Sequence, residues 1–382
     1  MAAAPHPGRP GLMRVMNDRA ALSYLIGHGP LTRQQIGEAT GLSGPTTTQV
    51  VRRLSDTGLV HVAGCVAGSR GPTATTYRAR IEAVLGVALD VHPSSASARV
   101  VDASGQSYPM ADVRFSGSRR QASSDLGRAI DAACEASGKS RADISAVCVG
   151  LPGAVVADTD QLKYADDLPG WPRHGVRAQL GEQLGVEILI ENDANLAAIA
   201  EAAAAGLTDF ALLWLGDGLG VASVSDGRLR RGAAGEIGYL PVSVSASVLD
   251  PAALTLQDLA GGAAVSRLVK QHIPAVGRYR AALQQIETSA SRSALLDALA
   301  PRIAEVLAPA IAVLDPAVVV LGGPTGAAGG AAGAAAVQSY LRHGTPWGTP
   351  VVSTVVPGNP VLRGAELHLA EHLRAALLER VT

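Results

Sequence analysis

Short apolar segments that run into glycine turns recur along the chain after residue 84, and they narrow the choice of fold. Val84–Asp90 and Ile144–Val149 have the length and continuous apolar character of buried strands. Alanine-rich helical segments follow, and the pattern restarts at Phe210. We expect further strands at 98–101, 186–190, 210–215, 219–224 and 318–321, and helices at 123–137, 176–184, 192–205 and within 256–313. The sequence therefore predicts an α/β body of two similar halves, each with strands first and helices after.

The composition indicates a folded chain with a closely packed interior. Hydrophobic residues make up 47% of the 382 residues and charged residues 17%, which excludes a disordered polymer. Aromatic residues are only 3% and glycines number 43, so small side chains must carry much of the packing. No uninterrupted apolar run reaches the length of a membrane span. Cys65, Cys134 and Cys148 are too few and too scattered for a disulfide framework, so we expect the protein in the reducing cytoplasm.

The charge is distributed unevenly between the two parts of the chain. Residues 1–80 hold nine arginines and no lysine against three acidic residues, a balance of +6. Residues 81–382 hold the other 23 basic and 30 acidic residues, a balance of −7. Only the N-terminal part can therefore attract a polyanion.

Three short helical patterns follow one another within this basic part. Thr32 and Gln35 form a capping-box pattern for the second helix, and Gly41 ends it. Ser43 is the expected cap of the third helix, with Pro45 in its first turn. The order of helix, short turn and helix predicts a helix-turn-helix, whose second helix enters the DNA major groove. The residues expected to face inward on that helix are Val50, Val51 and Leu54.

The exposed side of the third helix carries side chains suited to DNA. Glutamine can bond adenine with two hydrogen bonds, threonine can contact phosphate or a thymine methyl group, and arginine can pair with phosphate or guanine. Two strands, 59–62 and 73–78, are expected to flank a wing with Arg70 at its tip, suited to a minor groove. The alternative is a three-helix packing module without a DNA role. The predicted DNA contacts are Thr46, Thr48, Gln49, Arg52, Arg53 and Arg70.

Three motifs in the body resemble those of the ROK family (repressor, open reading frame, kinase). They are Asp226–Pro241, Ile190–Asn195 and Leu168–Trp171. The resemblance runs from about residue 13 to 380, and the winged helix makes the chain similar to the repressor branch, which includes xylose and N-acetylglucosamine repressors. It implies an actin-like, sugar kinase-like body of two lobes around a cleft. We expect three parts: a disordered tail at 1–12, a winged helix-turn-helix at 13–80 and a body at 84–382. Within the body, the first lobe is expected at 84–205 with a C-terminal helix at 364–380, and the second lobe at 206–363.

The same resemblance implies a sugar pocket in the cleft. Carboxamide and carboxylate groups suit the recognition of sugar hydroxyls. Asp193 stands at the position of the catalytic base in family kinases, which we take here as vestigial, and the alternative is that Asn192 or Asp193 only caps the following helix. Tyr239 stands where relatives have a histidine. The predicted effector contacts are Pro152, Gly153, Asn192, Asp193, Glu236 and Tyr239.

The phosphate loops of the family kinases are altered in this chain. The first would read Asp-x-Gly-Gly-Thr and reads Asp90-Val-His-Pro-Ser94, where His92 adds bulk and Pro93 removes a backbone donor. The second carries Asp217 between glycines, and a carboxylate about 5 Å from a phosphate repels it by roughly 3 kcal/mol per charge pair. We therefore expect no ATP-dependent kinase, although a sugar kinase with an appended DNA-binding head remains the alternative.

The zinc ligands of the family are missing as well. No cysteine follows Cys148, and the stretch 243–256 contains no thiol or imidazole, so we expect no metal and no cofactor. The loop that zinc organises in relatives must be held by packing or be mobile. We expect a homodimer or a dimer of dimers that binds a double-stranded DNA operator and has no membrane partner. Its body is expected to sense a sugar or related metabolite. The further alternative is a ligand-independent DNA-binding dimer with a vestigial cleft.

Overall fold

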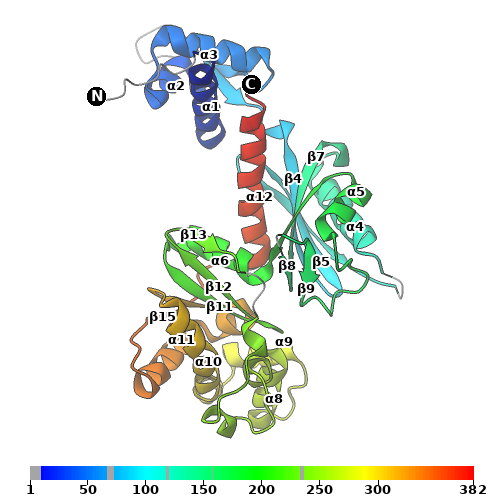
Figure 1. The fold of residues 1–382 in the computed structure, drawn as a ribbon, viewed down its shortest axis with the longest axis vertical. Coiled ribbons are helices and arrows are strands. Elements are labelled where there is room, and N and C mark those ends of the chain that lie inside the picture. Colours follow the sequence, from blue (N-terminus) through cyan, green and yellow to red (C-terminus); the bar gives the residue numbers. More distant parts are fainter. Residues whose placement is uncertain (1–9, 67–72, 118–119, 157, 233–235) are drawn as a thin grey trace, which may run out of the picture.

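The computed structural model describes residues 10–66, 73–117, 120–156, 158–232 and 236–382 (Figure 1). A small head lies at one end of the molecule, and two α/β lobes form the rest. The C-terminal helix α12 (Pro360–Glu379) runs between the lobes and the head, and the C-terminus lies beside the head (Figure 1). Within the described ranges, no helix has the length and apolar character needed to cross a membrane.

The head consists of three helices and a small antiparallel sheet. The helices are α1 (Pro10–His28), α2 (Arg33–Thr40) and α3 (Gly44–Asp56). The sheet has the order β1-β3-β2, with β1 at Leu31–Thr32, β2 at Val60–Val66 and β3 at Ala74–Ala79. This is the predicted helix-turn-helix with its wing. The wing tip with Arg70, and the tail up to residue 9, lie outside the described residues.

The helix signals in the head had mixed outcomes. The capping box of Thr32 and Gln35 is present, and Gly41 ends α2 with a left-handed φ of 70°, so both predictions are confirmed. The prediction that the Ser43 side chain caps α3 is wrong. Its hydroxyl lies 2.9 Å from the Thr46 hydroxyl, so the two side chains bond each other and the backbone of the first turn is left without this cap.

The first lobe is built on a five-stranded sheet. Its order is β10-β7-β4-β5-β6, in which β4, β5 and β6 are antiparallel and β7 and β10 run parallel to β4. The strands are β4 (Leu85–His92), β5 (Ser95–Asp102), β6 (Ser107–Arg114), β7 (Ile144–Leu151) and β10 (Glu187–Asn192). The remaining elements are η1 (Ile81–Ala83), α4 (Ala122–Ser137), η2 (Arg141–Asp143), α5 (Val176–Leu184) and the short pair β8 (Ala154–Val156) and β9 (Gln161–Lys163).

The second lobe repeats this topology. Its sheet has the order β13-β12-β11-β14-β15, again with three antiparallel strands followed by two parallel ones. The strands are β11 (Phe210–Leu215), β12 (Leu219–Ser225), β13 (Arg228–Arg230), β14 (Val319–Gly322) and β15 (Val351–Ser353). Its helices are η3 (Ile237–Tyr239), η4 (Ala246–Val248), α7 (Leu256–Ala260), α8 (Gly262–His272), α9 (Tyr279–Thr288), α10 (Arg292–Leu314) and α11 (Gly323–Gly344). Helix α6 (Asp193–Ala205) follows β10 of the first lobe and packs on α12 and on β12. The shared topology confirms the prediction of two similar α/β halves.

Helix α12 connects the body to the head through one continuous apolar core. It packs on β4, β7 and α6, and its far end contacts α1. Leu373 and Leu377 of α12 belong to the same buried cluster as Leu22 and Leu25 of α1. The helix begins at Pro360, ahead of the expected residue 364, because Asn359 caps it. Its 20 residues span about 30 Å. The boundary between the lobes at residues 205 and 206 stays a proposal.

Candidate effector site and DNA-binding surface

Two of the predicted effector residues meet where β10 passes into α6. Asn192 ends β10 and caps α6, because its Oδ1 accepts a hydrogen bond of 3.2 Å from the Asn195 amide. Its Nδ2 donates to the Gly153 carbonyl at 3.1 Å. The capping role and the position beside the Pro152-Gly153 loop are therefore compatible, as the sequence suggested.

Asp193 lies in an environment that disfavours its charge. Burial, together with the charges of Asp90 and Glu236, raises the pKa of Asp193 to about 7, against the hydrogen bond from the Ala194 amide and the charge of His92. Burial also raises the pKa of Glu236. Glu236 precedes η3 of the second lobe, whereas Asp193 follows the last strand of the first lobe. The two carboxylates from different lobes are thus close enough to influence one another.

Two side chains contact Asp90 in the segment 90–94, which the family resemblance compares to a phosphate loop. The buried carboxylate of Asp90 accepts a hydrogen bond of 2.7 Å from Asn359 Nδ2, and the same oxygen lies 3.1 Å from His92 Nε2. The hydrogen bond with Asp90 raises the pKa of His92, and burial opposes it. Asp193 and Asp217 raise this pKa further. The imidazole of His92 and the amide of Asn359, which caps α12, therefore both contact the Asp90 carboxylate in this loop.

The second glycine turn is held tightly as well. Gln257 of α7 donates to the Asp217 carbonyl at 2.6 Å and accepts from the Leu219 amide at 2.9 Å. A Cβ placed on Gly262, the first residue of α8, would lie 2.7 Å from Asp217 Oδ1. The carboxylate thus lies against the positive N-terminal end of α8, which is the kind of place where a phosphate would otherwise bind.

Two residues near the predicted effector positions, Tyr164 and Arg231, were not predicted from the sequence. Tyr164 follows β9 in the first lobe, and the centroid of its ring lies 5.5 Å from that of Tyr239, which is 64% exposed. Arg231 donates to Glu191 Oε2 at 2.5 Å, so the segment after β13 is tied to the end of β10. Neither Tyr164 nor Arg231 has a spacing signal that predicts its partner. The only hint for Arg231 was its place inside the Asp226–Pro241 motif.

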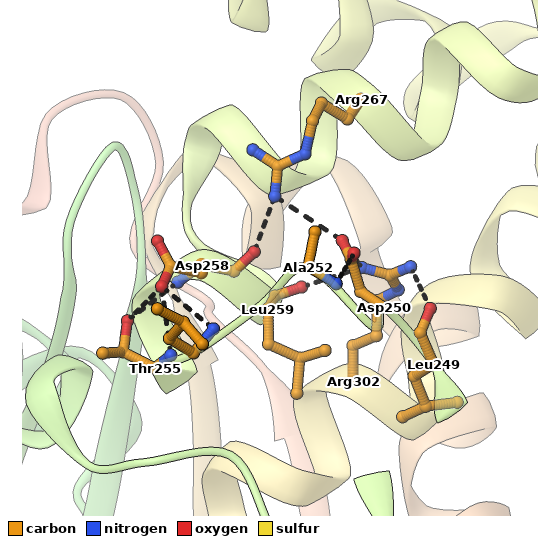
Figure 2. A network of polar contacts seen from close by, with 9 residues as sticks. Leu249, Asp250, Ala252, Thr255, Asp258, Leu259, Arg267 and Arg302 are labelled. Carbon is orange, nitrogen blue, oxygen red and sulfur yellow. Dashed lines mark hydrogen bonds and ion pairs between the residues drawn. The ribbon is translucent and has the colours of Figure 1, made fainter. Parts of the chain in front are cut away.

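Residues 243–256, where the family resemblance implies a zinc loop, are held by a network of polar contacts (Figure 2). Arg302 of α10 is only 7% exposed, and its guanidinium donates to the carbonyls of Leu249 and Leu259 at 2.6 and 3.1 Å. It also lies 3.4 Å from Asp250 Oδ2. Burial opposes ionisation of Asp250, but the Ala252 amide and Arg302 hold its pKa below the usual value. A Thr255–Asp258 capping box fixes the start of α7.

Among the residues that the structure describes, no group of three histidine, cysteine or acidic side chains is arranged to hold a metal ion. For residues 243–256 the sequence allowed packing or mobility, and the contacts of Arg302 and the Thr255–Asp258 capping box are packing contacts. A buried arginine bound to two carbonyls and a carboxylate holds this segment in place.

The exposed face of α3 carries most of the predicted DNA contacts. Thr48, Gln49 and Arg52 are exposed and Thr46 is partly exposed, whereas Val50, Val51 and Leu54 are buried as expected. Thr46 bonds Ser43, Thr48 donates to the Gly44 carbonyl at 3.0 Å, and Arg52 lies 3.7 Å from Asp56 on the helix surface. Exposed side-chain contacts of this kind contribute little to stability, and their side chains readily exchange partners.

Arg53 differs from the other members of the predicted set. It forms a two-pronged ion pair with Asp18 of α1, with distances of 2.8 Å from Nε and 2.6 Å from Nη2. Asp18 is only 4% exposed, and the pair raises the pKa of Arg53 through the hydrogen bond with Asp18. Breaking such a pair leaves a buried charge uncompensated. The structure therefore places Arg53 as a tie between α1 and α3, and its contact with DNA stays a prediction.

Comparison with known proteins decides the family. The ROK family model matches residues 87–362, which is well over half of the chain. The chain belongs to the ROK family. In this ROK protein a model of the MarR family also matches residues 17–71, within the winged helix.

Curated relatives include both regulators and kinases. An N-acetylglucosamine repressor from Escherichia coli O157:H7 is 26% identical over 250 residues, which cover 62% of this ROK protein and 59% of the repressor. A glucokinase from Halalkalibacterium halodurans is 31% identical over 124 residues, which cover 31% of this chain and 37% of the glucokinase. The chain thus matches less than two thirds of the length of each.

Solved structures agree with the fold. A ROK family transcriptional regulator, described as a homologue of the Escherichia coli MLC protein, has a TM-score of 0.69 at 16% identity and covers 97% of this chain and 99% of its own. A glucokinase from Streptomyces griseus in complex with glucose and AMPPNP has a TM-score of 0.60 at 22% identity and covers 74% and 98%. A winged helix followed by a two-lobed, actin-like body is therefore the fold of this protein.

Proposed function

We propose that this ROK protein is a sequence-specific DNA-binding transcription repressor, acting in the cytoplasm as a homodimer or dimer of dimers, whose body binds a carbohydrate effector. The observation that carries the proposal is the exposed polar face of α3 on a winged helix, in the part of the chain with a charge of +6. The relative that is an N-acetylglucosamine repressor supports the same function.

The effector part of the proposal rests on the predicted effector residues. Asn192 lies beside Gly153, and Asp193 interacts electrostatically with Glu236 of the other lobe. These amide and carboxylate groups can pair with several hydroxyl groups at once. The charges of Asp90 and Asp217 near His92 favour an unphosphorylated sugar over a sugar phosphate, because these carboxylates repel each phosphate charge.

Specific DNA recognition is expected to depend on Gln49. Replacing Gln49 with alanine should weaken operator binding by about 1–3 kcal/mol, roughly 5- to 150-fold, and leave non-specific binding nearly unchanged, because this side chain is placed to meet a base edge. Electrophoretic titration with operator and random DNA measures both. Ser55→Ala, an exposed change near the other end of α3, is the control. Equal operator binding by Gln49→Ala and Ser55→Ala would contradict the proposed docking of α3.

The runner-up function, a sugar kinase with a DNA-binding head, is supported by the glucokinase relative. Two observations argue against it. His92 and Asn359 occupy Asp90 in the first phosphate loop, and the Asp217 carboxylate lies against the start of α8 in the second. A coupled ATP-hydrolysis assay with a sugar panel is expected to show no turnover above that of Asp193→Asn. Turnover that disappears in Asp193→Asn would establish the kinase instead.

A further inference from the structure

Two tyrosines from different parts of the body meet beside the predicted effector residues. The rings of Tyr164 and Tyr239 are 5.5 Å apart and inclined by 37°, which is a favourable aromatic contact. Both side chains also face solvent, with exposures of 39% and 64%. Aromatic residues make up only 3% of the chain, so an exposed pair is an unusual use of them.

The backbone of Tyr164 is held in a costly conformation. Its φ is 54°, in the left-handed region that non-glycine residues rarely adopt. Such a conformation is strained and persists only where the surroundings enforce it, most often at functional sites. The fold therefore holds this ring in place against backbone strain, which indicates a role beyond the contact with Tyr239.

The surroundings of Tyr164 connect it directly to the predicted effector residues. A Cβ on Gly153 would lie 2.9 Å from the Lys163 carbonyl and 3.1 Å from the Ala165 side chain, so the two neighbours of Tyr164 pack on Gly153. Gly153 in turn accepts the hydrogen bond from Asn192. The residues on both sides of Tyr164 therefore contact Gly153, which is hydrogen-bonded to Asn192.

Tyr239 has the equivalent connection in the second lobe. It ends the single turn of η3, and its amide approaches the carbonyl of Glu236 at 3.4 Å. The tyrosine pair therefore joins the segment that carries Glu236 to the segment that packs on Gly153. The two rings therefore belong to segments that also hold or contact the groups that suit hydroxyls.

We propose that Tyr164 is a specificity-determining residue of the effector site, and that the Tyr164–Tyr239 pair contacts the C–H face of a pyranose ring. The inference rests on the proposed carbohydrate-binding function and deepens it. A pyranose offers hydroxyl groups at its edge and an apolar face of C–H groups. The edge matches Asn192, Asp193 and Glu236, and the face matches a tyrosine ring. An open-chain alditol with the same carbon skeleton keeps hydroxyl groups but lacks the face.

The test compares ring and open-chain ligands on the full chain by isothermal titration calorimetry. The probes are D-glucose with D-glucitol, and N-acetyl-D-glucosamine with its alditol. The variants are Tyr164→Ala, Tyr164→Phe and Tyr164→Gly. For a pyranose that binds the wild type, Tyr164→Ala should lower affinity about tenfold and Tyr164→Phe should retain it. The alditols should bind more weakly than the pyranoses to the wild type, and no variant should change their affinity.

Tyr164→Gly separates ligand contact from backbone conformation. Glycine adopts a φ of 54° without strain, so this variant should be at least as stable as the wild type in a thermal melt. If it also loses affinity for the pyranose, the ring itself contacts the ligand. Wild-type affinity in both Tyr164→Gly and Tyr164→Ala would overturn the inference while the proposed function stands. Failure of the wild type to bind either pyranose would contradict the carbohydrate part of the proposed function, and this inference with it.

Discussion

Replacing Gly364 with alanine is expected to destabilise the body by about 3 kcal/mol or more. Gly364 lies in α12 where this helix crosses α6, and an added Cβ would lie 1.8 Å from the Leu196 carbonyl oxygen and 2.4 Å from its carbon. These are backbone atoms, so the whole of α6 or α12 must shift. Overpacking typically costs 1–3 kcal/mol and occasionally more, and a clash with backbone belongs at the upper end. The better helix propensity of alanine offsets only about 1 kcal/mol.

Gly127→Ala is the matched control for this substitution. Gly127 also lies inside a helix, α4, but its nearest neighbour would be Leu184 Cδ2 at an ordinary 3.7 Å. This variant should be neutral or up to about 1 kcal/mol more stable than the wild type. Calorimetric melting curves of both variants measure the difference. Equal melting temperatures for Gly364→Ala and Gly127→Ala would show that the α6–α12 crossing is looser than the structure indicates.

Gly364→Ala should disturb the candidate effector site as well as the fold. Residues Asn192 and Asp193 stand at the start of α6, and Asn359, which bonds Asp90, caps α12. A shift of either helix moves these groups relative to one another. The crossing at Gly364 therefore sets both the stability of the first lobe and the geometry of the candidate site.

Signals confined to a few neighbouring residues were readable from the sequence. Thr32 and Gln35 are three residues apart, and Gly41 needs only its own backbone, so the capping box and the end of α2 were predicted correctly. Strand periodicity likewise indicated two similar halves, because each strand carries its own apolar pattern. The resemblance of the motifs supplied the family and the positions of Asn192, Asp193 and Glu236.

Contacts between distant segments were not readable in the same way. Arg53 and Asp18 are 35 positions apart, and the exposed side of a helix gives no indication that one arginine turns toward another helix. Tyr164 follows β9 and Tyr239 ends η3, and Arg302 reaches a carboxylate 52 positions away. Ser43 matched the capping pattern but bonds Thr46, since one hydroxyl has several partners within reach. Tertiary packing decides such choices.

Glu236→Ala is expected to abolish the response of operator affinity to the effector. A ligand shifts an equilibrium only if it binds two arrangements of the protein with different affinity. A sugar that contacts Asn192 of one lobe and Glu236 of the other would favour one arrangement of the lobes. Helix α12 begins beside Asp90 at one end and shares its apolar core with α1 at the other. In the dimer that we propose, a change in the site can therefore alter the spacing of the two heads, which must match the DNA half-sites.

The size of this response is expected to be about 5- to 150-fold, because coupling energies between sites are typically 1–3 kcal/mol. Glu135→Ala, an exposed change on α4, is the matched control and should respond like the wild type. The competing interpretation is that Glu236 only holds its glycine-rich segment together. In that case Glu236→Ala would lower the melting temperature and weaken operator binding with and without effector.

The most direct test is the operator affinity of the wild type, Glu236→Ala and Glu135→Ala, each measured by titration with and without a sugar that binds the wild type. A DNA-binding repressor with a carbohydrate-sensing body requires that the sugar change the affinity of the wild type and of Glu135→Ala. It also requires that Glu236→Ala bind the operator like the ligand-free wild type in both conditions. An operator affinity that the bound sugar leaves unchanged in the wild type would contradict the account, because the body would then bind a ligand without controlling the DNA-binding head.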